Sequence, residues 1–187
     1  MFLLPLLLGV VMSEGTFEKP WQGADVQANQ YYGKAAVQQV EKNVKTSLTL
    51  PQKRIVELEG YVPGYYLDHK KNKTYGVGQT GEFMKDSFLQ TYNKMYDRAE
   101  DIFGVLGDMP EELQAELVQV VYRGDAKKTH TWVEQFNNGY YKKAADSLLV
   151  HREYMDYKKE GIENSITRRL EAASKMLIKY DGGFGDD

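Results

Sequence analysis

The sequence predicts an α+β fold in which a small β-hairpin lobe lies beside a larger, mostly helical lobe, with a cleft between them. The hairpin is predicted by "YYLD" and "TYGVG", two short strand-like runs joined by the polar segment 69–73 and preceded by the turn residues Pro63 and Gly64. The helical lobe is predicted by apolar residues that recur at three- and four-residue steps over 84–103. Further helices are expected at about 110–122, 129–136, 140–150 and 164–177.

The compact domain is expected to begin near Thr49, where a capping hydroxyl and Pro51 precede the helical run "QKRIVELEG". Gly60 supplies the left-handed stop that commonly ends a helix. Glu59 then lies at the negative end of the helix dipole, which favours the neutral, protonated form of a carboxyl group. Such a carboxyl is suited to donate a proton.

Three parts of the chain are distinguished: an extension over 1–48, a compact domain over 49–180, and a Gly-rich flexible tail over 181–187. The apolar run at the start is about a dozen residues long, too short for a membrane-spanning helix. It suggests either an export signal that lacks a basic segment or a docking peptide for a larger assembly. The rest of the extension has loosely helical spacing, and two interpretations stay open: a docking arm, or a helix packed on the main domain.

Composition excludes several classes of site. The chain has 187 residues and no cysteine, so disulfides and thiolate metal sites are absent. Its three histidines show no pair at metal-ligand spacing, and we expect no metal and no cofactor. A net charge of −3 without a dense basic run disfavours nucleic-acid binding. It also gives little attraction to an anionic cell wall.

Two carboxylates and a hydroxyl flank the predicted hairpin. Cleavage of a glycosidic bond needs one carboxylic acid to protonate the departing oxygen and a second group to place or become the nucleophile. Glu59 suits the first task, while Asp68, on a wetter hairpin, is expected to stay ionised. A five-residue loop would make Asp68 and Thr74 cross-strand neighbours, with β-carbons about 5 Å apart if directly opposite. The pair could then hold one water.

Gly76, Gly78 and Gly81 also spell G-x-G-x-x-G before a helix, the spacing of a dinucleotide-binding loop. That interpretation needs a βαβ unit, whereas the preceding strand here belongs to a hairpin. The glycines are better explained as positions where the backbone approaches a sugar chain closely.

Seven positions carry a resemblance to a known family. They are Glu59, Gly60, Tyr66, Asp68, Thr74, Gly76 and Gly78, with eight residues between Glu and Asp and five between Asp and Thr. This pattern resembles that of the phage-type lysozymes, the muramidase and endolysin family of glycoside hydrolases. The resemblance extends downstream through "MPEELQAELVQVVYRGD", "TWVEQFNNGYYKKAADSLL" and "SITRRLEAASKML", and covers roughly 49–177.

The resemblance implies a lysozyme-like fold and hydrolysis with inversion, with Glu59 as general acid and with Asp68 and Thr74 positioning the attacking water. Arg168, from the double-arginine segment, would pair with Glu59 and fix its orientation. Substrate contacts are implied near Gly78 and Gln79, the latter standing where many members carry histidine. Tyr122 is a candidate saccharide-facing aromatic residue.

The expected activity is therefore cleavage of the β-1,4 bond between N-acetylmuramic acid and N-acetylglucosamine in bacterial peptidoglycan, in the periplasm or at the cell wall. The apolar start, the long extension and the mild acidity favour a phage-encoded, virion-associated enzyme that binds other virion or tail proteins through 1–48. Alternatives are a free endolysin, an exported cellular enzyme, a chitin-cleaving variant, and a catalytically idle structural subunit of a virus particle.

Overall fold

The computed structural model describes residues 15–68 and 70–182, which fold into helices and a small antiparallel sheet. The predicted α+β class is thereby confirmed. The sheet has the order β1-β2-β3, with β1 at Val62–Leu67, β2 at Lys73–Gly76 and β3 at Gln79–Thr80. The α-helices are α1 Ala24–Asn29, α2 Gly33–Val44, α3 Leu50–Glu59, α4 Phe88–Phe103, α5 Glu111–Arg123, α6 Thr131–Asn137, α7 Tyr141–Leu148, α8 Arg152–Lys159 and α9 Ser165–Asp181. Short 3₁₀ helices occupy Gly81–Lys85 (η1) and Leu106–Asp108 (η2).

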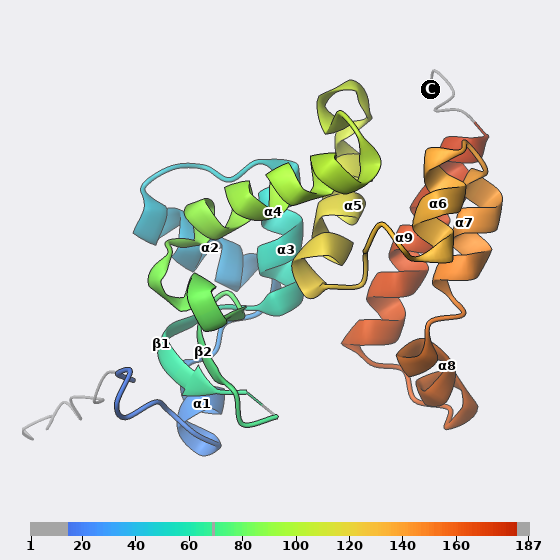
Figure 1. Ribbon diagram of the computed structural model, residues 1–187. Coiled ribbons are helices and arrows are strands. Elements are labelled where there is room, and N and C mark those ends of the chain that lie inside the picture. The colour runs from blue at the N-terminus through green and yellow to red at the C-terminus, as the bar shows by residue number, and fades with distance from the viewer. Residues whose placement is uncertain (1–14, 69, 183–187) are drawn as a thin grey trace, which may run out of the picture.

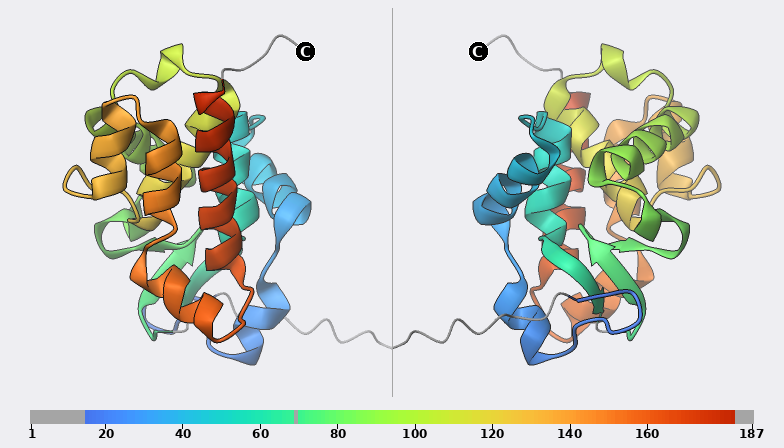
Figure 2. Two further views of the ribbon diagram at one scale, coloured as in Figure 1. Left: turned by 90° about the vertical axis from the view of Figure 1, so that its right-hand side faces the viewer. Right: turned by 90° about the vertical axis from the view of Figure 1, so that its left-hand side faces the viewer.

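Helix α5 is the centre of the helical lobe. Every residue from Ala115 to Val121 is buried, as expected for a helix enclosed on all sides by other elements. Helix α5 packs against α3, α4 and α9. Helix α9 also packs against α7, which in turn packs against α6 (Figure 1). In all views α1, the hairpin and α8 lie at the same end of the molecule (Figures 1 and 2).

Helix α3 begins and ends as its sequence predicts. Thr49 and Gln52 form a reciprocal capping box at its start, and Pro51 occupies the first turn. Gly60 ends the helix with φ of 74°, a backbone angle that favours glycine. The consequence is that Glu59 is the last helical residue and that the chain turns directly from it into the hairpin.

The register of the hairpin differs from the expected one. Tyr66 faces Thr74 and Leu67 faces Lys73, and the Asp68 amide donates to the Asn72 carbonyl at 3.0 Å. Asp68 therefore faces Asn72, and the prediction that it lies directly opposite Thr74 is wrong. The loop closes more tightly than assumed, because Lys71 adopts a left-handed φ of 64° and its amide donates to the Asp68 carbonyl.

The expected boundary at residue 49 does not separate two parts of the described chain. Ala36, Val37 and Val40 on α2, together with Leu48, belong to the same apolar core as α3. Trp21 packs on Val62 and Tyr66 of the hairpin. Residues 15–48 are therefore not detached from the main domain, and α2 packs on it as the second interpretation expects. A docking role for 1–48 stays a prediction. The apolar start lies outside the described residues, as do 183–187 of the expected tail.

Two further elements depart from expectation. Helix α8 was not predicted, because "REYMDYKK" is strongly polar and only Tyr154 of it is buried. Helix α4 begins at Phe88, after the N-cap Ser87, and the residues before it form η1. Within 15–68 and 70–182, no helix combines the length and apolar character needed to cross a bilayer.

Candidate active site

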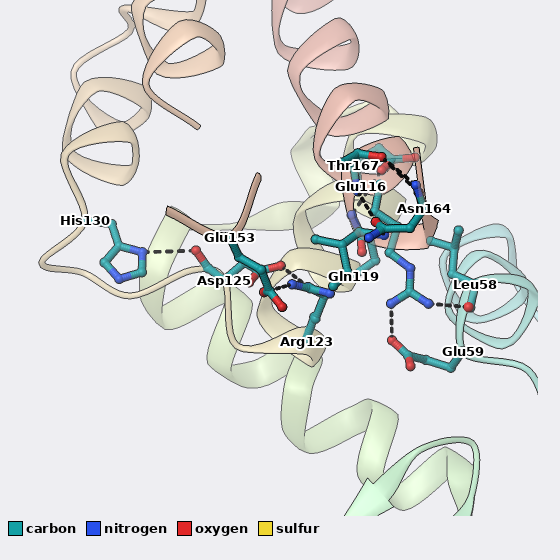
Figure 3. Close-up of polar contacts among 12 residues, drawn as sticks. Leu58, Glu59, Glu116, Gln119, Arg123, Asp125, His130, Glu153, Asn164 and Thr167 are labelled. Carbon is teal, nitrogen blue, oxygen red and sulfur yellow. Dashed lines mark hydrogen bonds and ion pairs between the residues drawn. The ribbon is translucent and has the colours of Figure 1, made fainter. Parts of the chain in front are cut away.

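The Glu59 carboxyl is held by an arginine from the far end of the chain. Its Oε1 lies 2.5 Å from Nη1 of Arg169, whose other terminal nitrogen donates to the Leu58 carbonyl. The Glu59 side chain is 24% exposed and that of Arg169 only 6%. Figure 3 shows Leu58 and Glu59 turned toward the same guanidinium group. The arginine thus fixes the last residues of α3 with a forked contact.

Arg168 does not fill this role, so that assignment is wrong. Arg168 is exposed, whereas Thr167, Arg169 and Leu170 face the interior on α9. Adjacent positions of a helix point about 100° apart, so only one of two neighbouring arginines can face α3. The buried face of α9 decides which one.

Asp68 is oriented by the loop that follows it. Its Oδ1 accepts hydrogen bonds from the amides of Lys70 at 2.8 Å and Asn72 at 2.7 Å. Its Oδ2 accepts from Nδ2 of Asn72 at 3.0 Å. Both carboxylate oxygens are therefore fixed by local donors, and Asn72 contributes two of them.

Thr74 is joined to Asp68 through the same asparagine. Its side chain is buried, and its hydroxyl donates to the Asn72 carbonyl at 3.1 Å. Because Thr74 faces Tyr66, it lies diagonally across the strands from Asp68, where side chains are about 7–8 Å apart. A water between the two groups is compatible with that spacing, although direct contact is not.

Two cavities meet at these residues. One, of about 370 Å³, and another, of about 410 Å³, share Glu59, Asp68, Gly78 and Thr80 in their linings. Thr74 lines the second cavity. The structure therefore brings Glu59, Asp68 and Thr74 to one cleft, and both carboxylates lie where its two halves join.

Gly78 lines both halves of the cleft, close to the Glu59 carboxyl group. Its φ is +70°, and a β-carbon there would lie 3.4 Å from Oε2 of Glu59. Glycine is needed for the backbone angle and also keeps the carboxyl group uncovered. The expectation that these glycines let the backbone approach a sugar chain closely stays a prediction.

Two tyrosines hydrogen-bond to the backbone of the cleft lining, Tyr66 at Gly78 and Tyr122 at Val77. The hydroxyl of Tyr122, on α5, donates to the Val77 carbonyl at 2.7 Å, next to Gly78. Burial, followed by the negative charge of Glu59, raises the pKa of Tyr122, so this hydroxyl keeps its proton. The pKa of Tyr66 is raised by burial and then by Glu59 and Asp68. Tyr122 also lines the first cavity, but its hydroxyl group is committed to the backbone.

Gln79 is a structural residue and does not line the two cavities that hold Glu59, which corrects its expected role in binding substrate. Its side chain is buried, and its amide nitrogen lies within hydrogen-bond distance of the carbonyls of Phe83 and Asp86 and of the Thr91 hydroxyl. These contacts fasten β3 to η1 and α4. The side chain turns inward because β3 presents Gln79 to the core and Thr80 to the solvent.

The first cavity is bordered by charged groups on its far side. Arg123, at the end of α5, contacts Asp125 at 2.5 Å and Glu153 of α8 at 2.8 Å (Figure 3). All three residues line this cavity, together with Lys70 from the hairpin loop. The unpredicted helix α8 thus closes one side of the cleft.

Comparisons with family models, with curated proteins and with solved structures found no match to this chain. Only the residues of the cleft and their arrangement therefore bear on its function. The sequence pattern missed Arg169, Asn72 and the part of the extension that lines the second cavity. A signal existed for Asn72, whose place between Asp68 and Thr74 is typical of a residue that closes a turn.

Proposed function

We propose that this chain is a glycoside hydrolase of the phage-type lysozyme kind, which hydrolyses the β-1,4 bond between N-acetylmuramic acid and N-acetylglucosamine in peptidoglycan. The supporting observation is that Glu59 and Asp68 line the same two adjoining cavities. Most glycosidases use a pair of carboxyl groups that flank the glycosidic bond in one cleft. The contiguous cavities also suit a polymer that continues on both sides of the bond to be cut.

In the proposed reaction Glu59 donates its proton to the glycosidic oxygen as the bond to the anomeric carbon breaks. Arg169 fixes the carboxyl through Oε1, which leaves Oε2, the oxygen nearest Gly78, directed at the cleft. Arg169 is a positioning residue, because it contacts the acid and not the substrate.

Water attacks the anomeric carbon from the opposite face, and its proton passes to Asp68. The Thr74 hydroxyl donates its hydrogen bond to the Asn72 carbonyl. The lone pairs of its oxygen can therefore accept a hydrogen bond from the attacking water. Asp68 is held by three donors of the loop and needs little reorganisation when the water is activated. The attack inverts the configuration at the anomeric carbon.

The proposal includes delivery with a virus particle that breaches the cell wall at the start of infection. A net charge of −3 provides no electrostatic attraction to an anionic wall, so the enzyme would reach it by being carried. Detection of the chain by mass spectrometry in purified particles tests this part. Its presence only in the soluble fraction of lysed cells would favour the free endolysin.

Analysis of the products tests the activity and the bond specificity together. Purified protein is incubated with peptidoglycan and, in parallel, with chitin, and the new reducing ends are converted to alditols with borohydride. The proposal predicts muramitol from peptidoglycan. Glucosaminitol from peptidoglycan would identify a different bond, cleavage of chitin alone would identify a chitinase, and no new reducing ends would contradict a hydrolase.

A further inference from the structure

The N-terminal segment forms a wall of the proposed catalytic cleft. The lining of the cavity of about 410 Å³ includes Glu59, Asp68 and Thr74, and it also includes Val26, Gln30 and Tyr32. The last three belong to α1 and to the connection between α1 and α2. None of them is part of the motif that identified the site.

Backbone hydrogen bonds hold this wall at both of its ends. Trp21 adds a parallel bridge to the edge of β1, with its amide 2.9 Å from the Tyr65 carbonyl and its carbonyl 3.0 Å from the Leu67 amide. At the other end, Tyr31 and Tyr61 exchange two backbone hydrogen bonds of 2.8 and 2.9 Å. A segment fixed on both sides of α1 presents its side chains in a defined position.

The wall also approaches the catalytic helix closely, at the residue that follows the acid. A β-carbon on Gly60 would lie 2.8 Å from the Tyr31 carbonyl oxygen, 3.2 Å from the ring of Tyr32 and 3.4 Å from Nε2 of Gln30. Gly60 therefore has two roles. It ends α3, and its lack of a side chain lets the segment 30–32 pack against it. As a result, the side chains of Gln30 and Tyr32 lie beside Gly60, the residue that follows Glu59.

The chemistry of the wall matches an N-acetylated amino sugar. Tyr32 is 63% exposed and offers an aromatic ring, the kind of surface on which the apolar face of a pyranose ring packs. The Gln30 amide offers one acceptor and two donor hydrogens, which are complementary to hydroxyl and acetamido groups. Val26 adds an apolar contact suited to the methyl group of the acetamide.

We propose that Gln30 and Tyr32 form a saccharide subsite for an N-acetylhexosamine unit next to the bond that is cut. The inference rests on the proposed function and adds a binding role for the segment that precedes the motif. The glycan runs along the wall, passes between Glu59 and Asp68, and leaves through the charged half of the cleft near Arg123 and Glu153.

Binding measurements in a Glu59→Gln background test the subsite without turnover. The probe is a defined tetrasaccharide of alternating N-acetylglucosamine and N-acetylmuramic acid, titrated calorimetrically. Tyr32→Ala and Gln30→Ala are each expected to raise the dissociation constant about fivefold to tenfold, the scale of one lost contact. Tyr32→Phe keeps the ring and is expected to bind as the parent does.

Tyr140→Ala is the matched control, because Tyr140 is 56% exposed, precedes α7 with the Lys143 ammonium over its ring, and lines neither cavity. All variants are first compared by thermal melting, and equal melting temperatures attribute the loss to binding. Affinity unchanged by Tyr32→Ala and Gln30→Ala, or no binding by the parent, would overturn the subsite.

Kinetics separate this inference from the proposed function. In the active protein, Tyr32→Ala is expected to raise KM for the tetrasaccharide while kcat stays within about twofold. If Glu59→Gln abolishes cleavage and Tyr32→Ala changes neither constant, the hydrolase stands and the subsite is wrong. If Glu59→Gln cleaves as well as the wild type, the proposed function itself is wrong.

Discussion

Asn72 donates to the Asp68 carboxylate twice, from its backbone amide at 2.7 Å and from its side-chain Nδ2 at 3.0 Å. Its carbonyl accepts from the Asp68 amide and from the Thr74 hydroxyl. One residue thus joins both groups that would position the attacking water. Asn72 contacts those groups and not the reacting atoms, so we regard it as a positioning residue.

Asn72→Ala is expected to lower kcat about tenfold with little change in KM, because Oδ2 of Asp68 loses the donor that orients it. The backbone amide still donates to Oδ1, which limits the loss. Steady-state kinetics on a soluble glycan measure both constants. Asn93→Ala, the same change at an exposed position of α4, is the control and should leave them unchanged. Equal kcat values for the two variants would contradict the positioning role.

Arg169→Ala is expected to lower both activity and stability, whereas Arg168→Ala leaves both near the wild type. The first change removes a buried partner of Glu59 and of the Leu58 carbonyl, at a cost of about 1–3 kcal/mol. The second removes an exposed side chain that points about 100° away from Arg169 around the helix. Urea unfolding measures the stability, and clearing of a peptidoglycan suspension measures the activity. A larger loss from Arg168→Ala would restore the assignment made from sequence.

Gly78→Ala is expected to reduce activity far more than Gly139→Ala does. Both glycines have left-handed backbones, with φ of +70° and +77°, so both changes carry a similar conformational cost of about 1–2 kcal/mol. Only at position 78 would the new methyl group meet the Glu59 carboxyl, whereas nothing lies within 4 Å at position 139. Thermal melting tests whether the two variants lose the same stability. Glycan cleavage measures the difference in their activity. Equal activity in both variants would remove Gly78 from the site.

A chain that begins at Thr49 is expected to unfold far more readily than one that begins at Gly15. The shorter chain lacks Trp21, Val40 and Leu48, which are buried against the hairpin and α3. Each large apolar side chain lost from a core costs roughly 1.5–3 kcal/mol. Melting temperatures of the two truncated chains test this expectation. Equal stability would support the detachable extension that the sequence suggested.

Glu116 makes stability depend on pH in a defined direction. Burial raises its pKa above the ordinary value of 4.5, although Arg54 at 2.8 Å acts in the opposite sense. A raised folded-state pKa stabilises the protein below the unfolded value, and that contribution is lost as the pH rises through the folded value. The free energy of unfolding of the wild type relative to Glu116→Gln should therefore fall from pH 4 to pH 7. A rise over the same interval would contradict the assigned direction.

Local patterns predicted much of the fold, because they act within one element. The capping hydroxyl of Thr49, the early Pro51, the stop at Gly60 and the two hairpin strands all depend on neighbours in sequence. The helix that carries Glu59 and the hairpin that carries Asp68 were predicted for this reason. Their convergence in one cleft was predicted from the two carboxyl groups that glycosidases need and from the resemblance, and not from any contact between these elements.

The features that sequence reasoning missed depend on contacts between distant segments. Whether Arg168 or Arg169 faces Glu59 is decided by how α9 rotates against α5 and α7. The alternation of strand residues does not fix the length of the loop between the strands. The loop is shorter than expected, so Asp68 lies opposite Asn72. Val26, Gln30 and Tyr32 reach the cleft only because the extension pairs with β1 and with Tyr61.

Replacement of Glu59 by glutamine shows whether this carboxyl group supplies the proton for bond cleavage. The change keeps the shape of the side chain and removes the proton that the glycosidic oxygen must receive. Glu57→Gln, the same substitution at an exposed position two residues earlier on α3, is the control. Clearing of a peptidoglycan suspension is expected to fall by at least about a hundredfold in Glu59→Gln and to be unchanged in Glu57→Gln. Equal clearing by Glu59→Gln and wild type would contradict the account.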